Sequence, residues 1–312
     1  YMMEKQQLLD LKQDDIIPFW ATGLQDLISL LPEGQLPFEE QRALAHQYMD
    51  LLEQFIRDYD RTSSHAYSIN NALTVLAFLP PIYAYMDTLE DKIRFIYRMV
   101  IRRHLSTYLH SQMVAHFAMV ILDSVLRSRP DLLIGFHGIA SAEEARSKRT
   151  QLMRFVRNAS LLHDIGKIVI PPDVLFKEEK LTAVEFEQIQ CHVLYGYHIL
   201  CGSQEPFFQL AANIAREHHE RFDGSGYLGL HGREIDRYAR MTAVADVFDA
   251  LTTERTYKKA WSFEDGFLYI LDHAGDFFDP EIVQLFEGSR EEIEAIYRVE
   301  NVRKPAVAAE AT

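Results

Sequence analysis

The stretch LLHDIGK at residues 161–167 is the part of the chain around which the rest is organised. His163 and Asp164 stand side by side at the end of an apolar run, and Lys167 follows four residues after the histidine. Polar groups in a hydrophobic element are unfavourable unless they are paired or bound. We therefore expect a metal site at this stretch, with further ligands supplied from elsewhere in the chain.

Length and composition are those of an ordinary globular protein. The chain has 312 residues, enough for one large or two modest domains. Of these, 48% are hydrophobic and 25% are charged. The net charge of −14 argues against binding of long nucleic acid through a broad basic face. A small anionic ligand remains compatible, because it needs only a local positive site.

The sequence also bears on location. We find no run of about 18 apolar residues and expect no membrane span. We also find no basic segment followed by a short apolar core, which is the pattern of a secretory signal. Cys191 and Cys201 fit free thiols in a reducing compartment better than a disulfide framework. We therefore expect a cytoplasmic protein.

Apolar residues recur at helical spacing along most of the chain, and neither βαβ alternation nor an internal repeat is visible. The pattern predicts an all-α fold. We expect an N-terminal helical accessory domain over residues 1–92, a main domain over 93–303 and a disordered tail over 304–312.

The first half of the main domain contains two predicted helices. In the helix over 91–128, His110 shares one face with Val114, Phe117 and Ile121. The pattern breaks over 128–150, which we interpret as a connection or insertion. The next helix, over 151–164, turns His163 toward the core, and Gly166 is expected to end it in a left-handed conformation.

Capping residues, prolines and glycines mark the ends of the predicted helices in the second half of the main domain. Thr182 and Glu185 form a capping box that opens a helix running through Leu200 and carrying His192. Pro206 opens a helix that ends at His218 and His219. A glycine-rich loop over 221–228 precedes an apolar helix over 235–252, and Asp279 and Pro280 open a late helix.

Seven polar side chains lie on apolar faces of these predicted helices. Each alone is more often a satisfied structural residue than a ligand, but together imidazoles and carboxylates suit iron, manganese or zinc. Their number exceeds what one tetrahedral metal needs and fits two neighbouring metals, an arrangement that hydrolyses phosphate esters. The candidate ligands are His110, His163, Asp164, His192, His218, His219 and Asp246.

Lys167 has two interpretations. It could be an ordinary surface lysine. Its place three residues after Asp164 favours a role in stabilising charge on a phosphate or protonating a leaving oxygen.

Several blocks of the sequence, in order, resemble the HD-GYP family, a group of bacterial cyclic di-GMP phosphodiesterases within the HD superfamily of metal-dependent phosphohydrolases. The resemblance covers residues 105–290 and implies an HD-type helical bundle. The blocks are LHDIGKI at 162–168, IP at 170–171, LT at 181–182, His192, HHER at 218–221, DGSGY at 223–227, ADV at 245–247, DALT at 249–252, and Arg255 with Tyr257.

The resemblance implies roles for individual positions. It matches the seven candidate ligands to the family's metal ligands, with Asp164 as the bridging carboxylate, and it leans toward iron. Lys167 matches the active-site lysine, while Arg255 and Lys258 match basic residues that hold substrate phosphates. Tyr227 matches the tyrosine of the name motif, which lies against the substrate.

The chain departs from the family's pattern at three places. Leu228 replaces the proline that ends the name motif, so the loop loses a fixed backbone angle. Some members carry a glutamate that supports a third metal, and Ser106 stands at that position here, so we expect two metals. The separation between His110 and His163 is long, consistent with the insertion.

Three functions stay open. The leading hypothesis is a cyclic di-GMP phosphodiesterase that gives linear pGpG or GMP. The second is a degenerate member that binds cyclic di-GMP or a signalling protein without turnover, which Leu228 favours and the intact ligand set opposes. The third is an enzyme for another cyclic dinucleotide or nucleotide.

Overall fold

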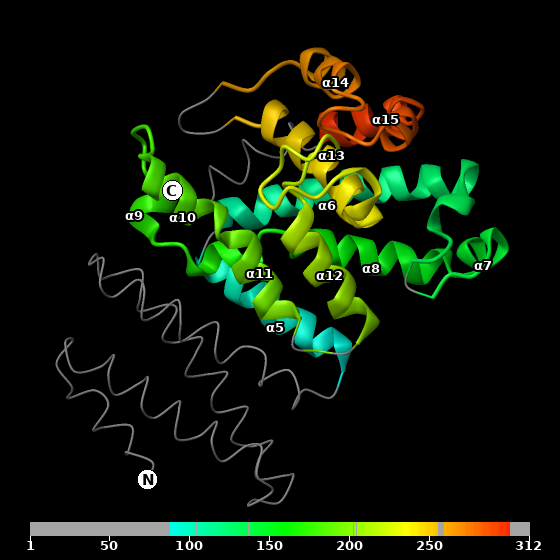
Figure 1. Ribbon diagram of the computed structural model, residues 1–312, viewed down its shortest axis with the longest axis horizontal. Coiled ribbons are helices and arrows are strands. Elements are labelled where there is room, and N and C mark those ends of the chain that lie inside the picture. The colour runs from blue at the N-terminus through cyan, green and yellow to red at the C-terminus, as the bar shows by residue number, and fades with distance from the viewer. Residues whose placement is uncertain are drawn as a thin grey trace, which may run out of the picture.

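The computed structural model describes residues 88–103, 105–136, 138–201, 203, 205–254 and 259–299. Within these ranges the chain forms helices, turns and one isolated bridge between Ala274 and Phe278, and it contains no strand. The predicted all-α class is confirmed for this part (Figure 1). The helices predicted over residues 1–87 and the predicted tail lie outside the described residues.

The helices follow one another closely, and most connections are short. Three of the elements are 3₁₀ helices, marked η. The elements are α5 (Leu89–Arg103), α6 (Leu105–Ser128), η1 (Pro130–Leu133), α7 (Ala142–Ser147), α8 (Arg149–Leu161), η2 (Ile165–Val169), α9 (Pro172–Leu175), α10 (Ala183–Gln190), α11 (His192–Leu200), α12 (Pro206–Glu217), η3 (Gly232–Glu234), α13 (Arg237–Thr252), α14 (Phe263–Asp272) and α15 (Pro280–Glu287). Residues 290–299 are also helical.

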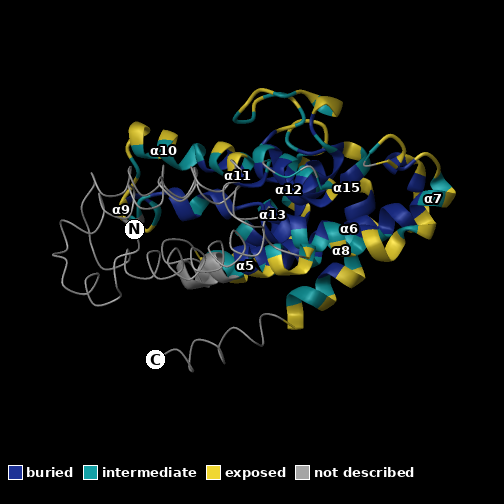
Figure 2. Ribbon diagram, turned by 90° about the horizontal axis from the view of Figure 1, so that it is seen from below, coloured by how far each residue is buried: buried dark blue, intermediate teal, exposed yellow. Residues whose placement is uncertain are grey.

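The core lies between α6, α8, α12 and α13. Helix α6 packs against both α8 and α13, and α12 packs against α8, α11 and α13. Figure 2 shows buried residues concentrated where these helices meet and exposed residues along the outer loops. Val114, Phe117 and Ile121 are fully buried, as their shared face on α6 predicts.

Helix α6 is the most apolar long helix among the described residues. Its Thr107–Ser128 part is long and apolar enough to cross a membrane by length and composition alone. Of that window, 61% is buried inside the fold, as expected for a core helix. The sequence of this part is not an unbroken apolar run, because polar residues such as His110 and Asp123 interrupt it.

Between residues 91 and 150, the predicted helix is wrong in detail, and the predicted connection contains short helices. The helix predicted over 91–128 is two helices, α5 and α6. The supposed connection over 128–150 contains η1 and α7, because the Ser141 hydroxyl accepts a hydrogen bond from the Glu144 amide and caps α7. The charged residues taken as a loop signal are therefore the exposed face of a short helix.

The stretch at 161–167 also differs from expectation. Helix α8 ends at Leu161, and His163 and Asp164 lie in the turn before η2. Gly166 is not left-handed; it lies inside η2. A Cβ on Gly166 would lie 1.9 Å from the carbonyl oxygen of His192, so this glycine permits close packing of η2 on α11.

The predicted caps in the second half are confirmed. Thr182 and Glu185 form the reciprocal capping box of α10, although the helix stops at Gln190 and α11 starts again at His192. Pro206 opens α12, and Asp279 caps α15 with Pro280 in its first turn. Gln190, the last residue of α10, and His218, directly after α12, line the same cavity.

Candidate metal centre

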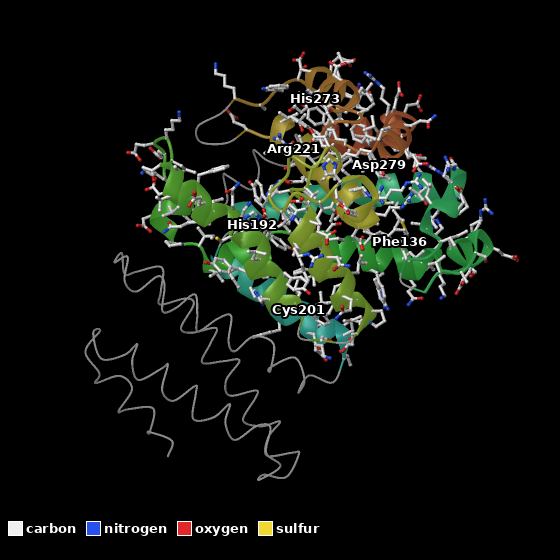
Figure 3. The ribbon with its side chains drawn as sticks, in the orientation of Figure 1. Phe136, His192, Cys201, Arg221, His273 and Asp279 are labelled. Carbon is white, nitrogen blue, oxygen red and sulfur yellow. The ribbon has the colours of Figure 1, made fainter. Side chains whose placement is uncertain are left out.

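Five elements bring all seven predicted ligands together. Helix α6 carries His110, and the turn after α8 carries His163 and Asp164. Helix α11 begins with His192, which Figure 3 labels. The end of α12 supplies two histidines and α13 supplies one aspartate. The side chains form two groups, His192, His218 and His219 with Asp164, and His110 and His163 with Asp246.

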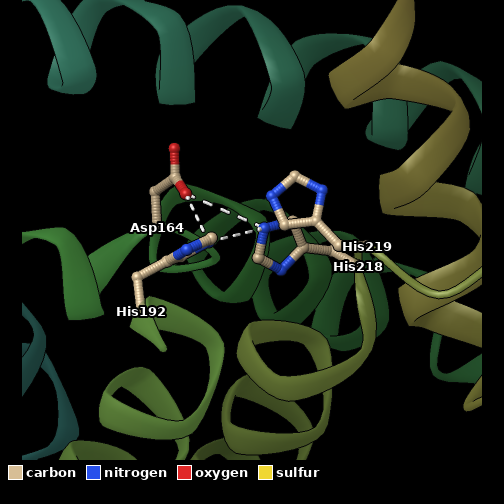
Figure 4. Close-up of side chains that lie close together, drawn as sticks. All are labelled: Asp164, His192, His218 and His219. Carbon is tan, nitrogen blue, oxygen red and sulfur yellow. Dashed lines mark hydrogen bonds and ion pairs between the residues drawn. The ribbon is translucent and has the colours of Figure 1, made fainter. Parts of the chain in front are cut away.

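The first group surrounds one oxygen of Asp164 (Figure 4). His192 Nε2 lies 3.3 Å from Asp164 Oδ1, and His218 Nε2 lies 3.7 Å from the same atom. The two Nε2 atoms are 3.5 Å apart. His219 is the most exposed member and also approaches Asp246, with its Nδ1 4.0 Å from Oδ2.

The second group lies on the other side of the Asp164 carboxylate. His110 Nε2 is 2.9 Å from Asp246 Oδ1, and His163 Nε2 is 3.9 Å from that oxygen. His163 Nε2 is also 3.3 Å from Asp164 Oδ2. The two oxygens of Asp164 therefore face different groups, as a shared carboxylate requires.

Backbone carbonyl groups fix the orientation of three imidazole rings. His163 Nδ1 lies 2.7 Å from the carbonyl oxygen of Ser160, and His192 Nδ1 lies 2.6 Å from that of Ile189. His218 Nδ1 approaches the carbonyl of Ile214 at 3.0 Å. A ring that donates its Nδ1–H in this way presents the lone pair of Nε2, which is the form that binds metal.

A carboxylate fixes the fourth ring. His110 Nδ1 is 2.5 Å from Asp249 Oδ2, so Asp249 holds the ring while Nε2 faces Asp246. Asp249 is buried, and the Thr253 hydroxyl donates to its other oxygen. Asp249 stands in the block DALT at 249–252, to which no role was given; a second carboxylate beside a ligand was the signal.

Two polar atoms at the centre of the site lack hydrogen bonds within the described residues. They are His163 Nε2 and Asp164 Oδ1, both fully buried. A buried lone pair without a donor is unfavourable, and a cation between the groups would satisfy both atoms. The donor set of imidazole and carboxylate thus fits transition metals.

The charge states suit metal binding. Burial raises the pKa of Asp164, but Lys167 and His163 outweigh it and hold the pKa well below its usual value. Burial also raises the pKa of Asp246, but interactions with His110 and His163 outweigh it and hold this pKa well below its usual value. Burial lowers the pKa of His218 to about 4, so this ring is neutral at neutral pH.

Lys167 lies beside the shared carboxylate. Its Nζ is 2.5 Å from Asp164 Oδ2, and its side chain is 20% exposed. The ammonium group therefore contacts the Asp164 carboxylate, and the lysine side chain is also partly exposed to solvent. It is not a free surface lysine.

A cavity of about 360 Å³ opens beside the first group. Tyr227 lines it, and its ring lies over that of His219 with a centroid distance of 4.7 Å. The predicted phosphate-binding residues Arg255 and Lys258 lie outside the described residues.

The loop that carries Tyr227 is held by Glu220, a residue that the sequence analysis quoted without a role. Its buried carboxylate accepts the backbone N–H groups of Leu228 at 2.7 Å and Leu230 at 2.8 Å. A Cβ on Gly226 would lie 2.5 Å from the Cα of Glu220, so only glycine permits this close approach.

Comparisons with known proteins agree with this geometry. The HD-domain family profile matches residues 139–282. The cyclic di-GMP phosphodiesterase response regulator RpfG of Xanthomonas campestris pv. campestris is 46% identical over 46% of this chain and 38% of its own length. The 3'3'-cGAMP-specific phosphodiesterase 2 of Vibrio cholerae is 35% identical over 75% of this chain and 41% of its own length. A cyclic di-GMP phosphodiesterase of Thermotoga maritima is 44% identical over 46% of this chain and 40% of its own length.

The chain thus spans about two fifths of the curated relatives that it matches. The HD-domain profile covers the part that carries six of the seven ligands, from His163 to Asp246. The motif blocks quoted above lie in the same part. Residues 139–282 therefore match an HD domain, and the motif blocks in this part resemble those of the HD-GYP family.

Proposed function

We propose that this chain hydrolyses a phosphodiester bond of cyclic di-GMP at a centre of two transition-metal ions. The observation that carries the proposal is the position of Asp164, whose two oxygens face two separate ligand groups. His192, His218 and His219 would hold one metal with it, and His110, His163 and Asp246 the other. Bound there, the metals would supply Lewis-acid activation of water and neutralise phosphate charge.

The residues of the chain contribute charge and position. The Lys167 ammonium beside Asp164 Oδ2 balances the carboxylate and stands ready to stabilise the departing 3′ oxygen or give it a proton. Tyr227 lines the cavity and would lie against the substrate. Arg255 and Lys258 would hold the phosphates, as the resemblance implies.

Iron is our preferred metal, with manganese and zinc as alternatives. The centre combines imidazole nitrogens with only two carboxylates, a donor set that all three metals accept. Linear pGpG, with or without further cleavage to GMP, is the expected product. We place the catalytic domain at residues 93–303 and the reaction in the cytoplasm.

A second substrate has specific support. One relative is named a 3'3'-cGAMP-specific phosphodiesterase, and its alignment covers 75% of this chain. A mixed cyclic dinucleotide is therefore the nearest alternative to cyclic di-GMP. Binding of cyclic di-GMP or of a signalling protein without turnover is the alternative from another class.

One experiment tests these proposals together. Protein purified without added metal is analysed for elements, and a digest of cyclic di-GMP is separated by chromatography. We expect about two transition-metal ions per chain and a pGpG product, and loss of both in Asp164→Ala. Asp272→Ala serves as the control, because Asp272 is an exposed aspartate outside the ligand groups.

The outcomes separate the alternatives. Metal with saturable binding of cyclic di-GMP and no product would favour the binding protein. Faster cleavage of 3'3'-cyclic GMP-AMP than of cyclic di-GMP would favour the mixed substrate. Full turnover by Asp164→Ala would exclude the proposed centre.

A further inference from the structure

Arg221 is a cation in the wall of the cavity beside the metal centre, and none of the roles assigned above involves it. It follows His218, His219 and Glu220 in the chain and lines the same cavity of about 360 Å³. Among the described residues that line this cavity it is the one arginine, and no lysine joins it. Figure 3 labels it on the side of the fold where α13 and α14 meet.

The guanidinium of Arg221 is held in a fixed plane. Its Cζ lies 3.9 Å from the centre of the Phe277 ring. Phe277 stacks on His273 at 4.7 Å, and His273 stacks on Tyr269 at 4.0 Å. A flat cation at the end of a column of rings loses little freedom when it binds a ligand.

The backbone also fixes this position. The Phe222 amide donates to the Phe277 carbonyl at 3.1 Å, and the Asp223 amide donates to the Asp276 carbonyl at 2.8 Å. The segment that follows Arg221 is therefore tied to the segment that carries Phe277. The side chain is positioned by two independent parts of the chain.

Within the described part of the protein, Arg221 acts on the exposed Asp223 carboxyl only at longer range, where its charge helps to lower the pKa of that group. No carboxylate there forms an ion pair with it, and its one hydrogen bond is a long contact of 3.4 Å from Nη1 to the Ser225 hydroxyl. In a chain of net charge −14, an arginine without a carboxylate partner at a cavity wall is unusual. Its N–H groups are available to a ligand in the cavity.

The other walls of the cavity favour a nucleobase near Arg221. Phe186, Val247 and Tyr269 contribute apolar and aromatic surface, which suits the flat face of a base better than a phosphate. The phosphate has its own position at the metal ligands His218 and His219, which form another part of the same cavity. A base bonded to the sugar beside that phosphate would extend toward Arg221.

We propose that Arg221 reads the O6 and N7 edge of one guanine of the cyclic dinucleotide, an inference that rests on the proposed function. The planar fork of arginine donates two parallel hydrogen bonds to these two acceptors. Adenine presents an amino group in place of O6, so a donor would face the donors of Arg221. One guanine satisfies the site, which makes cyclic di-GMP and 3'3'-cyclic GMP-AMP acceptable and disfavours cyclic di-AMP.

The test compares base preference in Arg221→Gln and in wild-type protein loaded with metal. The measured quantity is the kcat/KM for cyclic di-GMP divided by that for cyclic di-AMP. If cyclic di-AMP is not cleaved, its inhibition constant against cyclic di-GMP replaces its kcat/KM. We expect the preference for guanine to fall by about ten- to a hundredfold, the range of one good bidentate contact. Arg221→Lys should restore little, because an ammonium lacks the fork.

Arg233→Gln is the matched control, since Arg233 is an exposed arginine of the following segment that pairs with Glu281. It should leave the base preference unchanged. Equal losses for both dinucleotides in Arg221→Gln would show contact with a phosphate and overturn the proposal. An unchanged preference would overturn it as well.

Failure of the proposed function is distinguishable from failure of this inference. If wild-type protein cleaves no dinucleotide, calorimetric Kd values for the same two compounds replace the kinetic ratio. A preference for cyclic di-GMP in binding that Arg221→Gln removes would support Arg221 without hydrolysis. Equal Kd values for the two compounds in wild-type protein would overturn it.

Discussion

The backbone N–H of Leu228 donates a hydrogen bond of 2.7 Å to Oε1 of the buried Glu220 carboxylate. Proline, which ends the name motif of the family, has no N–H and cannot form this bond. The chain has therefore exchanged a fixed backbone angle for a bond to a charged acceptor. The loop that carries Tyr227 is therefore still anchored at Leu228.

Leu228→Pro is therefore expected to weaken the loop, although it restores the family's motif. Loss of a donor to a buried carboxylate costs about 1.5–3 kcal/mol, and this loss should appear in the free energy of unfolding measured in urea. The KM for cyclic di-GMP should rise as Tyr227 loses its position. Leu228→Ala is the control, because the leucine side chain is 39% exposed and its N–H is retained. Equal stability of the two variants would refute the role of this bond.

Asp249→Asn should weaken one metal site selectively. The variant keeps the size of the side chain but removes the charge that orients and polarises His110. Loss of such a partner lowers metal affinity by about 10- to 100-fold. Metal titration followed by elemental analysis should find one ion bound as in wild type and one weakened. Equal weakening of the binding of both ions would contradict this assignment, and so would unchanged binding of both.

The residue types of the site could be predicted from the sequence, but their grouping could not. Each ligand interrupts or directly follows an apolar helical pattern, and that is visible without a structure. His110 and Asp249 touch across 139 residues of sequence. Helical spacing places each on its own helix and carries no information about that contact, so the role of Asp249 was missed.

The ends of helices were predicted well where a capping residue determines them. They were predicted poorly where tertiary packing determines them. Thr182 and Asp279 cap their helices as expected, because a cap is formed by neighbouring residues. Leu161 ends α8 without any glycine or proline before it. That end reflects packing of the following η2 helix on α11, which is a tertiary contact.

In the metal-free protein, stability should fall between neutral and alkaline pH through His110. Burial lowers its pKa, but hydrogen bonds to Asp246 and Asp249 outweigh burial and raise the pKa from 6.5 to about 9. The raised pKa stabilises the fold fully below pH 6.5, and the contribution disappears as the pH rises through 9. A shift of this size corresponds to about 3 kcal/mol.

The measurement compares unfolding of wild type and His110→Gln in a chelator at several pH values. The stability advantage of wild type should shrink between pH 6.5 and 9, because His110 then loses its proton. Comparison with the variant removes the contributions of the other titrating groups. A constant difference across this range would refute the pKa assignment.

Gly166→Ala tests whether the packing of η2 on α11 assembles the ligands. The added Cβ would lie 1.9 Å from the His192 carbonyl oxygen and 2.5 Å from the Gly196 amide nitrogen, so one of the two elements must move. Since η2 follows His163 and Asp164 directly, and His192 begins α11, this movement separates ligands of the two elements. Overpacking of this kind costs about 1–3 kcal/mol, and elemental analysis should find both metals depleted.

Gly288→Ala is the control, because the nearest atoms to its Cβ lie at ordinary contact distances of 3.5 and 3.8 Å. A Gly166→Ala protein with full metal content would show that this contact does not position the centre.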